Sequence, residues 1–189
     1  MDDKKKELLN AAMQVFSEYG YHNAKISKIA EIANIGAGSV YLHFKSKEKI
    51  LEELFYTAWS AINEKCNTLV SSKLKVIQKL EELIITVVNL VENNKDLAIL
   101  ILHEYRFWNS GPSKKVNEVT DSVKEQIKAI IDSGINNGEI KKGINSDFAV
   151  AFFIGSIWHI LGYWADNKEN ISLTVVKEKL ISLIFTGIK

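Results

Sequence analysis

A single proline, Pro112, stands among the 189 residues of this chain. Average usage of about 5% would give roughly nine prolines in a chain of this length. Because proline lacks the backbone N–H donor and clashes with the preceding helical turn, its scarcity favours long, uninterrupted helices. Apolar residues recur at helical spacing almost throughout, and strict alternation of period two is nowhere sustained. We therefore expect an all-α fold.

The periodicity and the residues that interrupt it predict about nine helices. Gly20 is placed to end the first helix, and Ser27 and Ser46 are placed to begin the second and the fourth as N-caps. The residues from Asn34 to Gly38 are expected to form a turn. The expected helices cover residues 3–19, 27–33, 39–44, 46–72, 74–92, 95–109, 114–137, 146–166 and 172–187.

The early helices are short and the later ones are long, and no flexible linker lies between them. We therefore place a domain boundary inside the long fourth helix. The predicted domains are a three-helix helix-turn-helix unit over residues 1–49 and a helical bundle over residues 50–189. Without a linker, the two domains should share the fourth helix as a rigid connection.

Residues 27–44 have the pattern of a helix-turn-helix motif, which places its second helix in the major groove of DNA. Gly36 and Gly38 are expected to permit the turn. Val40 and Phe44 are four residues apart and are expected to face the core. This arrangement leaves the other side chains of the second helix for contact, namely Ser39, Tyr41, Leu42 and His43.

Positive charge gathers around this motif, although the whole chain carries a formal net charge of only +1. Two acidic residues, Glu31 and Glu48, oppose the nearby lysines, which suit phosphate contacts. An ordinary solvated helical hairpin is the alternative to DNA binding at this point. The lysines are Lys25, Lys28, Lys45, Lys47 and Lys49.

A set of residues between positions 7 and 55 forms a pattern of much higher specificity. It consists of Ala11-Ala12, Phe16, Gly20-Tyr21, Ile29-Ala30, Ala33 and the run from Gly38 to Leu51, with Tyr41, His43-Phe44 and Lys47-Glu48 at characteristic spacing. The pattern resembles the DNA-binding domain of the TetR family of bacterial transcriptional regulators. The chain departs from it at Ser27, where threonine is commonest, and in the turn from Ile35 to Gly38.

The resemblance implies which side chains approach DNA. Ser39, Tyr41 and Leu42 would lie in the major groove, where Leu42 is suited to a thymine methyl group. Tyr41, His43 and Lys47 would contact phosphates, together with two residues of the neighbouring helix. The implied DNA-binding residues are Ser27, Lys28, Gly38, Ser39, Tyr41, Leu42, His43 and Lys47.

The 18 residues from Phe148 to Ala165 carry no Asp, Glu, Lys or Arg. A membrane span needs about 20 apolar residues, but this stretch contains His159 and two glycines and lacks basic flanks, so we expect a buried or interface helix. The resemblance implies that the last two helices form a four-helix interface with a second subunit. A core helix within one chain is the alternative. The expected dimer residues are Phe148, Phe152, Gly155, His159, Gly162, Val176, Leu180, Leu183 and Ile184.

The resemblance further implies that the C-terminal domain binds a hydrophobic small-molecule effector. Arg106, the only arginine in the chain, either pairs with an internal carboxylate such as Glu104 or binds an anionic effector. The candidate ligand residues are Trp59, His103, Tyr105, Arg106, Trp108, Phe152, Trp158 and His159. Residues 97–106 and 138–143 resemble, more weakly, TetR-like regulators of fatty-acid degradation that respond to acyl-coenzyme A (acyl-CoA). A drug-like or other hydrophobic effector is the alternative.

Other classes of protein find little support in the sequence. Cys66 is alone and cannot form an internal disulfide, and His103-Glu104 lacks a second histidine at metal-binding spacing. Gly36-Ala37-Gly38 follows a helix and lacks the third glycine of a dinucleotide fingerprint. We expect no enzyme, no metal and no cofactor.

The N-terminus leads into charged residues and not into a signal peptide, so we expect a cytoplasmic protein without a membrane partner. The combined expectation is a homodimeric repressor that binds a palindromic DNA operator and is released by an effector. The alternative is a helical interaction protein or small-molecule binder that does not bind DNA.

Overall fold

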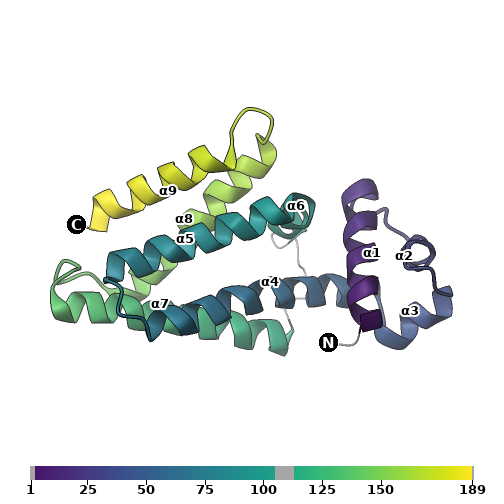
Figure 1. The fold of residues 1–189 in the computed structure, drawn as a ribbon, viewed down its shortest axis with the longest axis horizontal. Coiled ribbons are helices and arrows are strands. Elements are labelled where there is room, and N and C mark those ends of the chain that lie inside the picture. Colours follow the sequence, from purple (N-terminus) through teal and green to yellow (C-terminus); the bar gives the residue numbers. More distant parts are fainter. Residues whose placement is uncertain (1–2, 105–112, 189) are drawn as a thin grey trace.

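The computed structural model of the chain describes residues 3–104 and 113–188, which form nine α-helices and no strand (Figure 1). The predicted all-α fold is confirmed. The helices are α1 Asp3–Tyr19, α2 Ile26–Ile32, α3 Ala37–His43, α4 Lys47–Val70, α5 Val76–Asn93, α6 Lys95–Glu104, α7 Lys114–Asn137, α8 Ser146–Asp166 and α9 Leu173–Ile188.

The molecule is elongated, with α1, α2 and α3 gathered at one end (Figure 1). Helix α4 starts among these short helices and runs into the bundle formed by α5 to α9. Within the bundle, α5 packs against both α4 and α9, and α7 lies along α4. Helix α4 is therefore the shared connection that the sequence predicts.

Two hydrophobic cores lie along this connection. The first is built from α1 to α3 and the start of α4, up to Leu54 and Phe55, and it also contains Leu100 and Ile101 of α6. The second is enclosed by α5, α7, α8 and α9 with the far half of α4. Helix α6 therefore packs against the N-terminal unit. The predicted domain boundary between residues 49 and 50 stays a prediction.

The helix-turn-helix differs in detail from the prediction. Helix α2 begins at Ile26 after Lys25, and not with Ser27 as N-cap, because the amides of Lys28 and Ile29 already donate to the Lys25 carbonyl. Helix α3 begins at Ala37, so Gly38 lies inside the helix and not in the turn. The left-handed residue of the turn is Asn34, with φ of 52°, a conformation that asparagine tolerates better than most residues.

The connection between α7 and α8 folds tightly back onto α5. Gly134 of α7 permits this close approach, because a Cβ atom would lie 2.9 Å from side-chain carbons of both Ile140 and Val76 and would force them to shift. Glu139 of the same connection accepts a hydrogen bond of 2.8 Å from the backbone amide of Val76, the first residue of α5. The segment around residue 140 therefore fixes the far end of the bundle.

Helix α8 covers the predicted residues 146–166 and is the one helix in the described part of the chain that is long and apolar enough to cross a membrane. Its side chains nevertheless divide between two environments. Phe153, Ile157, Leu161 and Trp164 are buried in the bundle core, as expected for a helix that packs within a protein. The opposite side of α8 is exposed.

Candidate DNA interface, effector groove and dimer face

Helix α3 presents an exposed surface at the end of the molecule. Val40 and Phe44 are buried, as predicted, with 0% and 4% exposure. Because they point inward, Tyr41 and Leu42 point outward, and these two residues are 55% and 84% exposed. This exposure of large side chains marks a contact surface and not a packing surface.

The other predicted DNA-binding residues surround this surface. Ser27 and Gly38 are exposed, and Lys28 forms a 2.7 Å ion pair with Glu31 on α2. Ser39 and His43 are half-buried and line a small hollow, which also includes Lys4 of α1. The first turn of α1 therefore adjoins the α3 surface. The run of lysines from position 4 to position 6 was the available signal for it.

Lys47, predicted as a phosphate contact, is engaged by the protein itself. Its ammonium group donates hydrogen bonds to the backbone carbonyls of Tyr21 and His22, at 2.6 and 2.9 Å, and more weakly to that of Ala24 at 3.3 Å. It also lies 4.6 Å from the centre of the Tyr21 ring. Lys47 therefore fastens the segment between α1 and α2 to the start of α4.

We expect Lys47→Met to lower the free energy of unfolding by about 2 kcal/mol. Hydrogen bonds to charged groups contribute about 1.5–3 kcal/mol each, but the carbonyl groups that Lys47 leaves can bind water instead, which reduces the total loss. Urea denaturation measures this loss. Lys45→Met, at an exposed neighbouring position, is the control and should leave stability unchanged. If Lys47 instead served only as a phosphate contact, its replacement would reduce the salt dependence of DNA binding and leave stability unchanged.

A groove of about 890 Å³ lies between α7 and α8, with one residue from α4. At one end Trp59 and Trp158 stack, with ring centres 6.2 Å apart and an interplanar angle of 16°. The α8 residues from Asp147 to His159 span about 18 Å at 1.5 Å per residue. The lining residues are Trp59, Thr120, Lys124, Glu125, Lys128, Asp147, Val150, Ala151, Ile154, Gly155, Trp158 and His159.

The end of the groove away from the tryptophans is charged. Lys128 donates hydrogen bonds to Asp147 at 2.6 Å and to Ser146 at 2.8 Å, and the bond to Asp147 raises the pKa of Lys128. Lys124, one turn away, pairs with Asp121 at 2.8 Å. The groove thus combines an apolar aromatic end with a charged end, where the ammonium groups of Lys124 and Lys128 lie near the carboxylates of Glu125 and Asp147.

Three of the predicted ligand residues, Trp59, Trp158 and His159, line this groove. Phe152 is exposed and does not line it. His103, Tyr105, Arg106 and Trp108 lie outside the residues whose side chains the structure describes, so their roles stay predictions.

The sequence reading missed the α7 wall of the groove. Thr120, Lys124 and Lys128 are spaced four residues apart and share one helical face. This spacing was the available signal, but ordinary solvated helices also carry lysines at such intervals.

An exposed apolar face runs along α8 and α9. Phe148 and Phe152 are 78% and 56% exposed on α8, and Leu183 of α9 is 62% exposed. Gly155 lies between the α8 residues and His159, and no atom lies within 4 Å of where its Cβ would be. These five are the predicted dimer residues that are accessible to a second subunit.

The structure corrects the other four dimer residues. Val176, Leu180 and Ile184 are 4%, 0% and 1% exposed in the core of the same chain, and Gly162 is buried. These side chains are used within one subunit, because α9 packs on α5 and α8. The outward side of α9 instead carries Val175 and Leu183.

Comparisons with known proteins match both parts of the chain. A family profile described as "Bacterial regulatory proteins, tetR family" matches residues 8–54, and one described as "YsiA-like protein, C-terminal region" matches residues 55–187. The fatty acid metabolism regulator protein of Bacillus subtilis is 30% identical over 98% of this chain and 95% of its own length.

Solved structures agree with these matches over nearly the full length. FadR from Bacillus subtilis in complex with stearoyl-CoA has a TM-score of 0.86 at 30% identity, covering 97% of this chain and 99% of that one. FadR from Bacillus halodurans, a fatty acid degradation regulator, has a TM-score of 0.85 at 26% identity, with the same coverage of 97% and 99%.

These relatives are transcriptional regulators, and none of them is named as an enzyme. They confirm the weaker resemblance to regulators of fatty-acid metabolism as well as the main one. The exposed α3 of the helix-turn-helix and the two matched profiles, which together cover residues 8–187, lead to one conclusion. The chain belongs to the TetR family of bacterial transcriptional regulators.

Proposed function

We propose that this chain is a cytoplasmic homodimeric repressor, without a membrane partner, that is released from a palindromic operator by long-chain acyl-CoA. The observation that carries the proposal is the groove between α7 and α8, with its tryptophan pair at one end and Lys124 and Lys128 near the other. Helix α3 of each subunit would enter the major groove of the operator.

The groove suits a ligand with a long apolar chain and an anionic head group. Its volume of about 890 Å³ lies in the usual range of small-molecule sites, roughly 300–1,000 Å³. An acyl chain would pack against Trp59 and Trp158, and phosphates would lie near Lys124 and Lys128. Arg106 stays a further candidate for the same phosphates. The related Bacillus subtilis FadR is described in complex with stearoyl-CoA.

The α3 surface suits DNA in its chemistry. The hydroxyl groups of Ser39 and Tyr41 can contact phosphates or bases, and Leu42 can contact a thymine methyl group. In a two-fold symmetric dimer the two α3 helices would read half-sites about 34–36 Å apart, which is one helical turn of DNA.

The test begins with selection of bound sequences from a random DNA pool. Operator affinity is then measured by fluorescence anisotropy with stearoyl-CoA, stearate, coenzyme A or a lipophilic cation. We expect stearoyl-CoA to weaken operator binding by at least about 5-fold, the lower end of typical allosteric couplings, and to act more strongly than stearate or coenzyme A. Release by the cation and not by stearoyl-CoA would contradict an acyl-CoA effector.

Gly38→Ala tests how closely the α3 backbone approaches DNA. Gly38 has a helical backbone, and a Cβ there would meet no atom of the protein within 4 Å. Alanine should therefore keep the fold or stabilise it by up to about 1 kcal/mol. We expect operator affinity to fall at least about 10-fold, because the added methyl group would collide with the DNA. This loss of binding free energy is similar to that caused by one mismatched base pair. An unchanged affinity would show that the backbone stays away from the duplex.

A further inference from the structure

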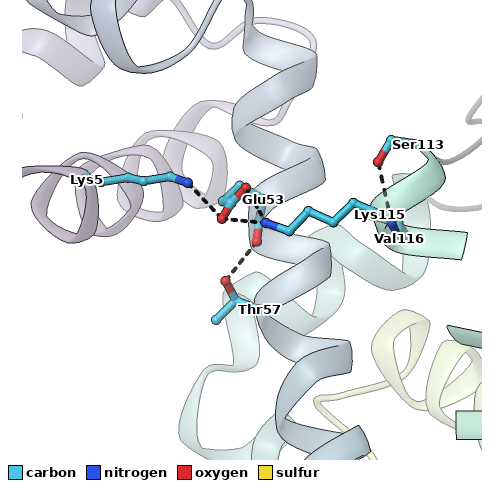
Figure 2. Close-up of polar contacts among 6 residues, drawn as sticks. All are labelled: Lys5, Glu53, Thr57, Ser113, Lys115 and Val116. Carbon is cyan, nitrogen blue, oxygen red and sulfur yellow. Dashed lines mark hydrogen bonds and ion pairs between the residues drawn. The ribbon is translucent and has the colours of Figure 1, made fainter. Parts of the chain in front are cut away.

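Glu53 is the point where three helices meet (Figure 2). It lies in the second turn of α4, and its carboxylate contacts two lysines that approach from opposite sides. Lys5 of α1 lies 2.9 Å from Oε1 of Glu53. Lys115 of α7 donates to Oε1 and Oε2 at 3.2 Å each. The carboxylate thus joins the DNA-binding unit to a helix of the groove.

The contact between Glu53 and Lys5 is better shielded than a typical surface ion pair, whereas the side chain of Lys115 is 46% exposed. The side chains of Glu53 and Lys5 are 17% and 29% exposed. Burial by itself raises the pKa of Glu53, but the hydrogen bonds and positive charges of Lys5 and Lys115 together outweigh it, so the pKa is lowered. Lys115 also lies 3.5 Å from the centre of the Tyr56 ring, so that α4 holds its ammonium group at two points.

Lys115 and the groove belong to the same rigid element. Helix α7 begins at Lys114 after Ser113, whose side chain accepts a hydrogen bond from the amide of Val116. Nine residues beyond Lys115, about 13.5 Å along the helix, Lys124 lines the groove. A ligand that displaces α7 must therefore move Lys115 relative to Glu53.

The far half of the same contact between helices is also polar. Asn63 of α4 accepts hydrogen bonds from Ser122 at 2.9 Å and from Gln126 at 2.7 Å, both on α7. Directional contacts of this kind define one relative position of two helices better than apolar packing does. Polar contacts therefore specify the relative position of helices α4 and α7.

We propose that Glu53 is the positioning residue through which α7 sets the orientation of the DNA-binding unit. When α7 moves, the bond from Lys115 to Glu53 changes, and with it the bond from Glu53 to Lys5 on α1. The distance between the two α3 helices of the dimer then departs from the spacing that the operator needs. The inference rests on the proposed function for its ligand, but the contact between α1 and α7 can be tested without one.

The first experiment uses hydrogen exchange in the full-length protein without effector. Lys5→Met, on α1, should speed amide exchange in the first turns of α7 by at least about threefold, and Lys115→Met should do the same in α1. In a Glu53→Gln background these cross-effects should disappear. Cross-effects that are absent from the parental background, or that persist in Glu53→Gln, overturn the proposal.

The second experiment measures operator affinity with and without stearoyl-CoA. In Glu53→Gln and Lys115→Met the ratio of the two affinities should approach 1, from a typical allosteric coupling of about 5–150-fold. Combining both changes should cause no further loss, and calorimetry should show unchanged affinity for stearoyl-CoA itself. A full parental ratio in Glu53→Gln contradicts the proposal.

Glu82→Gln is the matched control, because it removes the same charge from a 2.8 Å ion pair between α5 and Lys65 of α4, away from the DNA-binding unit. This variant should keep the parental ratio, and a loss as large as that of Glu53→Gln would contradict the proposal. Failure of the proposed function looks different. In that case stearoyl-CoA leaves the parental operator affinity unchanged, while the cross-effects in hydrogen exchange still support the role of Glu53.

Discussion

Tyr41→Ala is expected to weaken operator binding by about 100-fold while the fold and the dimer stay intact. A lost contact typically reduces DNA affinity by about 1–3 kcal/mol, and a dimer loses it twice. The sum of about 2–6 kcal/mol corresponds to a decrease of at least about 30-fold. Tyr41 is 55% exposed, so its truncation opens no cavity and should change stability by no more than about 0.5 kcal/mol.

Fluorescence anisotropy with the selected operator measures the affinity, and thermal denaturation measures the fold. Tyr19→Ala is the control, because Tyr19 is 42% exposed at the end of α1, outside the helix-turn-helix. It should keep parental affinity. Parental affinity in Tyr41→Ala would show that α3 does not use this side chain.

Phe152→Glu is expected to convert the proposed dimer into monomers. Phe152 and Gly155 lie on the exposed face of α8. Because Gly155 has no side chain, a helix of the partner subunit could approach α8 closely at this point. In a two-fold interface each residue occurs twice, so this change would bury two carboxylates without partners. Each costs several kcal/mol, and the dissociation constant should rise at least about 1,000-fold.

Sedimentation velocity measures the oligomeric state directly. Leu74→Glu places the same charge at an apolar position with 42% exposure, just before α5 and outside the exposed face of α8 and α9. It should leave the dimer unchanged. A dimer that survives Phe152→Glu would mean that subunits associate through a different surface, and operator binding would then have to be explained without this face.

The helices themselves could be predicted because their end signals are local. Ser113, Asn145 and Gly138 act at the ends of α7 and α8, and both helices have the predicted bounds. The N-terminal unit was predicted equally well on its inner side, where Val40 and Phe44 are buried. A periodic pattern identifies the apolar face of a short amphipathic helix, since the other face is polar.

The same reasoning failed for α9 because that helix has apolar residues on more than one side. Leu180 and Leu183 are three residues apart, yet the first is 0% exposed and the second 62%. A sequence pattern does not distinguish burial against the same chain from burial against a partner. The sequence also did not indicate that Lys47 binds backbone carbonyls. These carbonyl partners lie more than twenty residues earlier in the sequence, so no local pattern connects them to Lys47.

Leu100 and Ile101 of α6 complete the core of the N-terminal unit. That unit therefore lacks part of its own interior when it is cut from the rest of the chain. If the N-terminal unit were transferred to the bundle of another regulator, two cavities would remain in its core. They would be filled only if that bundle supplied apolar side chains of similar volume at the positions of Leu100 and Ile101. The packing between α6 and the N-terminal unit thus limits which DNA-binding units can be combined with which effector-binding bundles.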